Sequence, residues 1–486
     1  MQAKIAVVAA APANRKSLCV DLDGTLVASD TLWESLLLLL KNQPWKVLLL
    51  TTWLFKGKAF FKSQVAQSVD LNPAGLPYRE NVLSFLRQEW ESGREIILAT
   101  ASDQRIARSV AAHLGIFSAV ISSNGKVNLS GQHKLHALKE HVGDQPFDYI
   151  GNSSVDLPIW QSADESILVE PSSRLLNRAR RVSSVGRVFP LEANRLLTLL
   201  KALRVQQWVK NLLLFVPLIT AHQITDLFLV RRTFYAFIAF GLCASSVYVV
   251  NDLLDLESDR QHPRKKHRPF ASGALQIKTG LALVPLLVSL SFIIGASLLP
   301  PAFGLSLGLY FLITVAYSFY LKRVVALDVL VLAAFYTLRI LAGALAVNVT
   351  LSPWLLAFSI FFFLNLAFVK RYVELGASQK NNVSSISGRG YAVSDIEIIR
   401  SMGPVSGYLS VLVLALYIHS QEVAAIYRNP TFLWFVSLSL LYWITRVWIL
   451  AHRGEMVDDP ILFTFKDRVS YLVGGMIVIL MLKATF

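Results

Sequence analysis

Three aspartates at helical spacing form the group in this sequence that is best suited to chemistry. Asp252, Asp255 and Asp259 follow the apolar segment 234–250 at intervals of three and four residues, so a continuing helix would carry them on one face. Carboxylates so close together repel one another unless a cation lies between them, and their hard oxygens suit Mg²⁺ held jointly with substrate phosphates. The spacing therefore predicts a magnesium site that binds a diphosphate.

A basic run directly follows the acidic group. Its members are Arg260, His262, Arg264, Lys265, Lys266, His267 and Arg268. Cationic side chains donate charge-assisted hydrogen bonds to phosphates, so this run is predicted to bind another phosphate of the ligand. The alternative is an acidic helix end and a basic loop that only follows the positive-inside bias. It is disfavoured because acids at the mouth of a membrane helix are costly and usually functional.

The composition requires a membrane part. Of 486 residues, 54% are hydrophobic and 16% charged, which is too apolar for a soluble protein. The net charge of +15 comes from basic residues in short loops between apolar segments, which favours membrane lipids and phosphorylated substrates as partners and no nucleic acid. The two cysteines, Cys19 and Cys243, imply no disulfide framework. No cleavable signal peptide is expected at the N-terminus.

Nine apolar segments predict an all-α polytopic membrane bundle of nine transmembrane helices over residues 204–486. Each segment must be helical, because backbone polar groups in lipid have no other general partner. With the N-terminus inside, the connections carry 16 Lys and Arg residues on the inner side and 4 on the outer side. This bias places the first domain and the acidic group on the cytoplasmic side of a multi-pass membrane protein. A bacterial inner membrane is the expected location. The segments lie at about 211–223, 234–251, 280–299, 302–320, 325–347, 353–371, 403–420, 431–450 and 469–485.

Residues 1–165 predict a separate α/β domain. Three short apolar runs, at 17–26, 95–102 and 148–156, each finish in polar residues. The carboxyl ends of parallel strands meet at one edge of a doubly wound sheet, so these polar residues are expected to gather there. Residues 166–203, rich in arginine and serine, are predicted to be a basic juxtamembrane linker.

The polar residues of this domain resemble the motifs of the haloacid dehalogenase superfamily. The DxDGT motif falls on Asp21, Asp23, Gly24 and Thr25, the motif II hydroxyl on Thr100, and the phosphate-facing lysine on Lys134. The resemblance implies a Rossmannoid phosphatase with Asp21 as nucleophile and Asp23 as acid and base. It also implies an Mg²⁺ site, here formed by Asp21, Asp23, Asn152 and Asp156. Because Asn152 replaces a carboxylate of the GDxxxD motif, an active phosphatase and a weakened or structural domain both remain open.

The same resemblance implies a helical cap over residues 27–94. This stretch has short apolar runs flanked by Trp33, Trp45 and five lysines, and no run reaches the ~18 residues that span a bilayer. An interfacial hairpin in the headgroup region is predicted, and the alternative is a cap packed on its own core.

The acidic group resembles the NDxxDxxxD signature of the UbiA superfamily of intramembrane prenyltransferases, with Asn251 as its first residue. The residues from His262 to Gly273, and the earlier run from Arg204 to Asn211, resemble its polyprenyl-phosphate phosphoribosyltransferase branch. Other members carry a second aspartate-rich motif after the sixth span. Here that stretch is basic, with Glu374 as its single acid.

These features predict Mg²⁺-dependent transfer of 5-phosphoribosyl from phosphoribosyl pyrophosphate to a polyprenyl phosphate, whose product the N-terminal domain then dephosphorylates. The acidic group holds the metal and pyrophosphate, and the 5-phosphate is bound by His262, Lys265, Lys266 and Arg268. The lipid phosphate is bound by Lys210, Lys322, Lys370 and Arg371, and further substrate-binding residues are Asn211, Asn251, Arg339, Thr100 and Lys134. A salt bridge to Asp328 is the alternative role of Arg339. The alternative functions are an aromatic prenyltransferase with a polyprenyl pyrophosphate donor, and a transporter or non-catalytic lipid-binding protein.

Overall fold

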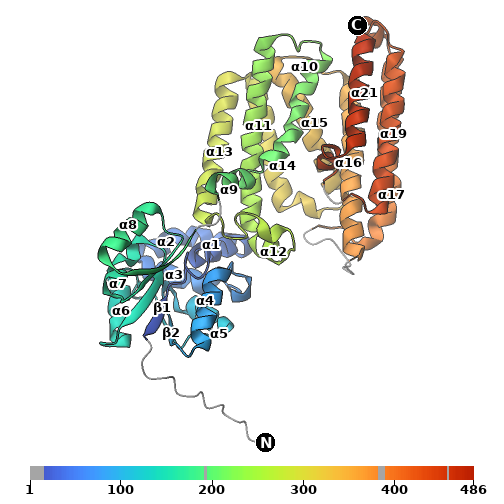
Figure 1. The fold of residues 1–486 in the computed structure, drawn as a ribbon. Coiled ribbons are helices and arrows are strands. Elements are labelled where there is room, and N and C mark those ends of the chain that lie inside the picture. Colours follow the sequence, from blue (N-terminus) through green and yellow to red (C-terminus); the bar gives the residue numbers. More distant parts are fainter. Residues whose placement is uncertain (1–15, 191–193, 381–388, 457–458, 486) are drawn as a thin grey trace, which may run out of the picture. The chain divides into compact units, whose positions relative to one another are not determined.

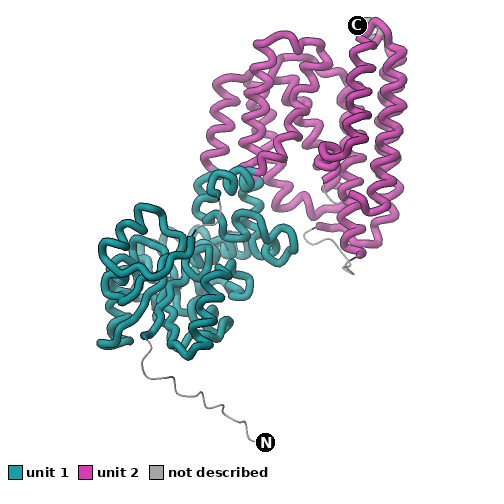
Figure 2. Tube along the Cα trace, in the orientation of Figure 1, with its two compact units in different colours: residues 1–203, 248–284 teal, residues 204–247, 285–486 magenta. Residues whose placement is uncertain are grey.

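The protein is described by a computed structural model covering residues 16–190, 194–380, 389–456 and 459–485 (Figure 1). The expectation about a signal peptide falls outside these residues. The chain divides into two compact units (Figure 2). Unit 1 comprises residues 1–203 and 248–284, and unit 2 comprises residues 204–247 and 285–486. The acidic group and the basic run therefore belong to the same unit as the N-terminal domain.

Unit 1 contains a six-stranded sheet in the order β3-β2-β1-β4-β5-β6, in which every neighbouring pair is parallel. The strand order reverses at β1, which pairs with β2 on one side and β4 on the other. Residues beyond the carboxyl end of β1 thus lie at the switch point where doubly wound sheets bind ligands. The strands are β1 Ser17–Val20, β2 Ile96–Asp103, β3 Ala119–Ser123, β4 Phe147–Gly151, β5 Ser166–Val169 and β6 Val185–Phe189.

Helices cover both faces of this sheet. Leu18 and Val20 of β1 pack with residues of α4 Glu80–Glu91 and α5 Gln104–Leu114. Cys19 packs on the opposite side with α6 Gln132–Val142, α7 Leu157–Ser162 and α8 Ser173–Val182, because successive strand side chains point to opposite faces. The predicted α/β fold of the N-terminal domain is confirmed.

The predicted linker over residues 166–203 is wrong for most of its length. Strands β5 and β6 extend the sheet, α8 covers it, and only α9 Arg195–Ala202 follows. All four residues of β5 are buried, so their backbone groups need the hydrogen bonds of the sheet. Arg187 of the half-exposed edge strand β6 stacks on Phe85, its guanidinium carbon 4.6 Å from the ring centroid. The basic residues of this stretch are therefore carried mainly by helix α8 and by strand β6, which are folded parts of the domain.

The cap is shorter than the predicted range 27–94. Helix α4 belongs to the core on the sheet, because Val82, Leu83 and Leu86 pack there. The elements before it are α1 Thr31–Asn42, η1 Pro44–Leu49, α2 Leu50–Phe55, α3 Lys58–Ser68 and η2 Pro73–Gly75. Helix α1 begins at the N-cap Asp30, whose side chain accepts from the Leu32 amide.

Unit 2 is a helical bundle. Within the described residues, eight helices of the chain are long and apolar enough to cross a membrane. Two of them, α11 and α13, continue into unit 1. The eight are α11 Leu227–Leu254, α13 Ile277–Leu298, α14 Pro301–Phe319, α15 Leu327–Val347, α16 Pro353–Lys380, α17 Ile396–Ile418, α19 Phe432–Arg453 and α21 Arg468–Thr485.

The ninth expected span, over 211–223, is not one long helix. It is divided between the 3₁₀ helix η4 Val205–Phe215 and the short helix α10 Val216–Thr220, which has Pro217 in its first turn. A 3₁₀ helix rises about 2.0 Å per residue and an α-helix about 1.5 Å, so the two together extend roughly 30 Å. That length equals the hydrocarbon core of a bilayer, although neither helix reaches it alone.

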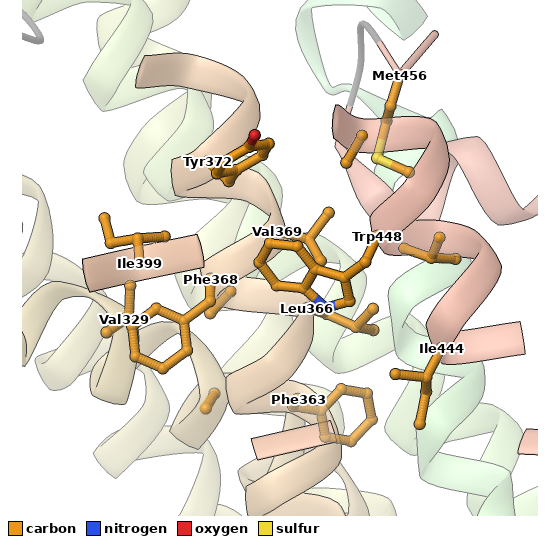
Figure 3. Packing of buried hydrophobic residues seen from close by; sticks show 14 of the residues in the cluster. Val329, Phe363, Leu366, Phe368, Val369, Tyr372, Ile399, Ile444, Trp448 and Met456 are labelled. Carbon is orange, nitrogen blue, oxygen red and sulfur yellow. The ribbon is translucent and has the colours of Figure 1, made fainter. Parts of the chain in front are cut away.

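The core of unit 2 lies where α15, α16, α17, α19 and α21 pack together. Figure 3 shows Phe363, Phe368 and Tyr372 of α16 together with Trp448 of α19 within this core, and the ring centroids of Tyr372 and Trp448 lie 5.5 Å apart. A Cβ on Gly403 of α17 would lie only 2.0 Å from Trp448, and one on Gly407 would lie 2.8 Å from a side-chain atom of α19. Small residues four apart thus let α17 approach α19 closely, as is common between membrane helices.

Candidate active sites

Asp21, Lys134 and Asp156 lie together at the carboxyl end of the sheet. The Lys134 ammonium is 2.8 Å from Asp21 Oδ1 and 3.6 Å from Asp156 Oδ1, and it donates to the Tyr149 hydroxyl at 3.0 Å. Tyr149 in turn donates to Asp156 Oδ1 at 3.0 Å. One buried cation thus serves two carboxylates, and it stands where it would neutralise a phosphoryl group attacked by Asp21.

Asp23 is held by the cap and by β2. Its Oδ1 accepts from the Thr31 backbone amide at 2.7 Å, and its Oδ2 accepts from the Ser102 hydroxyl. The Ser102 amide donates to Thr100 Oγ1 at 3.1 Å, so the predicted motif II hydroxyl is buried beneath the serine that contacts Asp23. Ser102 was not among the predicted site residues. The polar end of this strand was noticed in the sequence, and it was the signal that could have identified Ser102.

The two motif I aspartates carry negative charge into a buried site. Burial raises the pKa of Asp21 to about 6, against the opposing effect of Lys134, and burial raises the pKa of Asp23 to about 6 as well. Both carboxylates have thus lost solvation by water. A Cβ on Gly24 would lie 2.1 Å from the Asn152 amide nitrogen, so the Asn152 side chain reaches the motif I loop.

The donor set of this site fits Mg²⁺. Two carboxylates and one amide oxygen are hard ligands, and a cation would stabilise the ionised form of the two carboxyls that burial removes from water. Asp156 is committed elsewhere, because its oxygens accept from Tyr149 and from the Ser153 amide at 3.1 Å. Across the described ranges no three His, Cys, Asp or Glu side chains are grouped as a metal site, so Asn152 and oxygen ligands from substrate or water would complete the shell.

A cavity of about 50 Å³ adjoins Asp23, and both flanking cap helices line it. Thr31 and Ser35 come from α1, and Lys62 comes from α3. The Lys62 ammonium donates to the Ala101 carbonyl at 2.7 Å and to Asn128 Oδ1 at 3.0 Å. Burial lowers the pKa of Lys62 below its ordinary value. This lysine was recognised only as one of the cap lysines, because the sequence does not reveal which of the five faces the cavity.

The acidic group of the second site does not lie on one continuous helix. Helix α11 ends at Leu254, Asp255 stands at the break, and α12 Leu256–Gln261 follows, so the expected single helix face is wrong. Asp252 and Asp259 nevertheless meet, each 2% exposed. Arg268 Nη1 donates to Asp252 Oδ1 at 3.1 Å and to Asp259 Oδ2 at 2.6 Å. A guanidinium thus neutralises the two carboxylates for which a metal was predicted.

The basic run divides into two sets. Arg260 donates to both carboxylate oxygens of Glu34 in α1, at 2.6 and 3.2 Å, and Arg268 binds the aspartates. His262, Lys265 and Lys266 are exposed, on and beside the 3₁₀ turn η5 Lys265–His267. Asn251 is half-buried in the last turn of α11. The exposed set has the charge and freedom that an anionic ligand needs.

In unit 2, Lys210 of η4 and Lys370 of α16 meet at Asp459. Asp459 Oδ2 lies 2.9 Å from the Lys210 ammonium and 3.3 Å from that of Lys370. Asp459 also caps α20 Pro460–Thr464, because its Oδ1 accepts from the Ile461 amide at 3.1 Å. Burial acts to raise the pKa of Asp459, but Lys370 and Lys210 hold it well below its ordinary value. The structure thus brings two predicted lipid-phosphate ligands together on an acid whose role the sequence did not specify.

An apolar cavity of about 360 Å³ adjoins this cluster, within the usual size of a small-molecule site. Its walls come from η4, α16, α19, α20 and α21, with Phe362, Leu366 and Trp443 among the lining residues. As far as the described residues define it, Lys210 is its one charged lining residue. A long apolar chain with an anionic end matches this arrangement.

Two buried arginines of unit 2 have different partners. Arg371, fully buried, lies 2.5 Å from Asp328 and pairs with Glu374, so it belongs to a closed ion-pair cluster. Arg339 is not paired with Asp328. It donates to Asn211 Oδ1 at 2.9 Å and to neutral oxygens of α14 and its own helix. Arg371 was expected to bind the lipid phosphate together with Lys370, but it lies in this separate ion-pair cluster instead.

The remaining predicted ligand is Lys322. It lies half-buried in the turn η6 Leu321–Arg323, between α14 and α15. The buried Asn211 Nδ2 has no hydrogen-bond partner among the described residues, so its NH2 group can still donate to a ligand or water.

The sequence comparisons agree with these two domains. Residues 213–466 match the UbiA prenyltransferase family, and residues 18–161 match the haloacid dehalogenase-like hydrolases. The chain belongs to the UbiA prenyltransferase family, and it is an integral membrane enzyme with a haloacid dehalogenase-like hydrolase domain at its N-terminus. Both family resemblances are confirmed.

Individual relatives resemble the chain to different extents. An uncharacterized protein, y4nM of Sinorhizobium fredii, is 38% identical over 95% of this chain and 89% of its own length. Decaprenyl-phosphate phosphoribosyltransferase of Mycobacterium tuberculosis is 33% identical over 40% of this chain and 65% of its own length. A solved UbiA homolog from Archaeoglobus fulgidus, bound to DMAPP and Mg²⁺, covers 59% of this chain and 96% of that chain, with a TM-score of 0.44 and 15% identity.

Proposed function

We propose that the membrane domain transfers 5-phosphoribosyl from phosphoribosyl pyrophosphate to a polyprenyl phosphate. The observation that carries the proposal is the apolar cavity of about 360 Å³ beside the Lys210, Lys370 and Asp459 cluster. A lipid chain fits the cavity, and a phosphate suits two lysines that share one carboxylate. The relatives named decaprenyl-phosphate phosphoribosyltransferase support the same substrate class.

The lipid phosphate is the nucleophile in this reaction. It needs no general base, because it is already ionised at pH 7. One of its oxygens attacks C1 of the ribose, the bond from C1 to the pyrophosphate oxygen breaks, and pyrophosphate leaves with the electron pair. Lys210 and Lys370 align the attacking phosphate, so catalysis rests on charge neutralisation and orientation.

Residues of unit 1 bind the phosphoribosyl donor. Lys265 and Lys266 are exposed cations that suit its 5-phosphate, and the exposed imidazole of His262 beside them can donate a hydrogen bond to it. Asp252, Asp255 and Asp259 would hold Mg²⁺, which when bound neutralises the leaving pyrophosphate. Arg268 contacts Asp252 and Asp259, and Mg²⁺ bound to these carboxylates would replace that pairing. Arg268 can then turn to the donor's phosphate.

The N-terminal domain removes the 5-phosphate from the phosphoribosylated lipid. Asp21 attacks phosphorus, the bond from phosphorus to the 5-oxygen breaks, and Asp23 protonates the leaving alcohol. Water then attacks the aspartyl-phosphate, Asp23 accepts its proton, and inorganic phosphate is released. Lys134 neutralises the transferred group, and hydrogen bonds from Ser102 and Thr31 orient Asp23.

One reconstitution tests both steps. The purified chain in nanodiscs is given Mg²⁺, phosphoribosyl pyrophosphate and a C50 or C55 polyprenyl phosphate, and the lipids are weighed by mass spectrometry. The unaltered protein is expected to form ribosylated lipid. Asp252→Asn forms neither product, Asp21→Asn accumulates the phosphoribosylated lipid, and Asp164→Asn on the exposed surface serves as the control.

The alternative enzyme gives a different result. If phosphoribosyl pyrophosphate stays intact while a polyprenyl pyrophosphate is consumed with an aromatic acceptor, the protein is an aromatic prenyltransferase. If Asp252→Asn changes no lipid product in the cell either, a transporter or lipid-binding role replaces both enzymatic proposals.

A further inference from the structure

Between the two cap helices that line the phosphatase cavity lies a hairpin whose apolar residues face solvent. It consists of η1 and α2, residues 44–55, and none of these described residues is buried. Phe55 is 92% exposed, Leu48 80% and Trp45 64%. Soluble surfaces rarely gather large apolar side chains in this way, so the hairpin is a binding surface.

The charge around the hairpin is of one sign. Residues 41–62 contain five lysines and no aspartate or glutamate. Lys41, Lys56 and Lys58 are exposed beside the apolar residues, at the two ends of the hairpin. Short amphipathic helices with exposed tryptophan and phenylalanine and a lysine border bind at the boundary between lipid headgroups and acyl chains.

The chain itself supplies the bilayer. Eight of its described helices are long and apolar enough to cross a membrane, so the hairpin is always tethered to a lipid surface. A stretch of 12 residues is too short to span, which leaves the interface as the membrane region it suits. An acidic protein partner would need no such tether, and the covalent link to membrane helices favours lipid.

We propose that residues 44–57 dock into the interface of an anionic membrane and so direct the phosphatase cavity to phosphate monoesters carried on lipids. The geometry lies in unit 1 alone. The hairpin leaves α1, which supplies Thr31 and Ser35 to the cavity, and leads into α3, which supplies Lys62. Docking holds both helices at the headgroup level, where a lipid-borne monoester presents its phosphate. The substrate class rests on the proposed function, whereas the docking does not.

Docking is measured without any enzymatic activity. Both native cysteines, Cys19 and Cys243, are buried, so an environment-sensitive dye attaches selectively to Phe55→Cys. The full chain is placed in nanodiscs with phosphatidylglycerol, and quenching by spin-labelled lipid is compared with quenching by aqueous iodide. The dye at residue 55 is expected to be quenched by lipid and protected from iodide. The same dye at Val182→Cys, an exposed apolar position on α8, is expected to show the reverse.

A second part of the experiment changes the charge of the hairpin and of the lipid. Lys56→Gln and Lys58→Gln are each expected to shift the docking equilibrium about fivefold toward the undocked state, and pure phosphatidylcholine is expected to act in the same direction. If the dye at residue 55 stays open to iodide in every lipid, the docking proposal fails. If its protection rises with protein concentration and persists in detergent, a second copy occupies the hairpin and the lipid proposal is overturned.

The substrate class has its own readout. Leu48→Ser/Phe55→Ser is expected to lower hydrolysis of a lipid-borne monoester at least tenfold while hydrolysis of a water-soluble monoester is unchanged. Equal loss on both substrates would overturn the directing role, because a misfolded cap explains it. Docking observed with no phosphatase activity on either substrate would leave the hairpin as a membrane anchor and would remove the proposed function of the N-terminal domain instead.

Discussion

Removing the charge of Lys210 is expected to weaken lipid phosphate binding more than the loss of one lysine explains. Asp459 Oδ2 lies 2.9 Å from Lys210 and 3.3 Å from Lys370, so one carboxylate is shared between two cations. Two lysines and one aspartate leave the cluster with a single positive charge. In Lys210→Met the carboxylate pairs wholly with Lys370, and the cluster becomes neutral.

The size of the effect follows from hydrogen bonds between charged groups. Each contributes about 1.5–3 kcal/mol, so losing one lysine contact raises the dissociation constant about 10- to 150-fold. The dissociation constant of Lys210→Met is expected near the upper limit of this range, because Asp459 then neutralises Lys370. The double variant Lys210→Met/Asp459→Asn restores one positive charge on Lys370, and its affinity is expected within about tenfold of the unaltered protein.

Two measurements compare the single and double variants with the unaltered protein. The first is the polyprenyl phosphate concentration that half-saturates transfer, and the second is the rise in unfolding temperature that the lipid causes in nanodiscs, which needs no activity. Arg400→Gln, on an exposed part of α17, is the control that leaves the cluster intact. A double variant that binds no better than Lys210→Met would refute the shared carboxylate, because independent contributions add.

Three further outcomes follow from the structure. Asn152→Asp adds a carboxylate to the phosphatase site and is expected to raise Mg²⁺ affinity about tenfold, measured by titration calorimetry. Because burial raises the pKa of both Asp21 and Asp23 to about 6, Mg²⁺ must displace one or two protons below that pH. The Mg²⁺ affinity is therefore expected to fall about 10- to 100-fold per pH unit there, and a flat profile from pH 7 to pH 5 would contradict the raised pKa values. Gly403→Ala is expected to lower the free energy of unfolding by about 1–3 kcal/mol, because the added methyl group would collide with Trp448. Gly376→Ala is expected to raise it by up to about 1 kcal/mol, because a Cβ there meets nothing within 4 Å and alanine favours the helix. Chemical unfolding measures both.

The arrangement of Asp21, Asp23 and Lys134 was predictable because the two aspartates follow a strand end. Asp21 and Asp23 follow β1 within three residues, so assigning the strand also placed the carboxylates. Lys134 comes from a helix, but its motif order placed it correctly beside Asp21. Strands β5 and β6 were missed because a four-residue strand and a half-exposed edge strand with an arginine carry little apolar periodicity.

The membrane cluster was predictable only in part, because partners on different helices are invisible to sequence spacing. Arg371 and Lys370 are adjacent in sequence and both end an apolar segment, yet adjacent helical residues point about 100° apart. Arg371 therefore reaches Asp328, 43 residues away, while Lys370 reaches Asp459, 89 residues away. Asp459 lacked an assigned role for the same reason, since only the folded chain brings it between two lysines.

The two buried arginines of the bundle show where an anion would be accepted. Arg371 and Arg389 share the carboxylates of Asp328 and Glu374, so this cluster is already neutral and needs no further anion. Arg339 is 4% exposed and, among the described residues, has hydrogen bonds only to neutral oxygens, including Asn211. A buried cation without a counterion is costly in a membrane bundle, and an anionic ligand nearby lowers that cost. The Lys210 ammonium and the Arg339 guanidinium carbon each lie 5.8 Å from the ring centroid of Tyr336, so the charge of Arg339 lies near the lysine cluster. This proximity favours the phosphate head of the lipid at that end of the cavity.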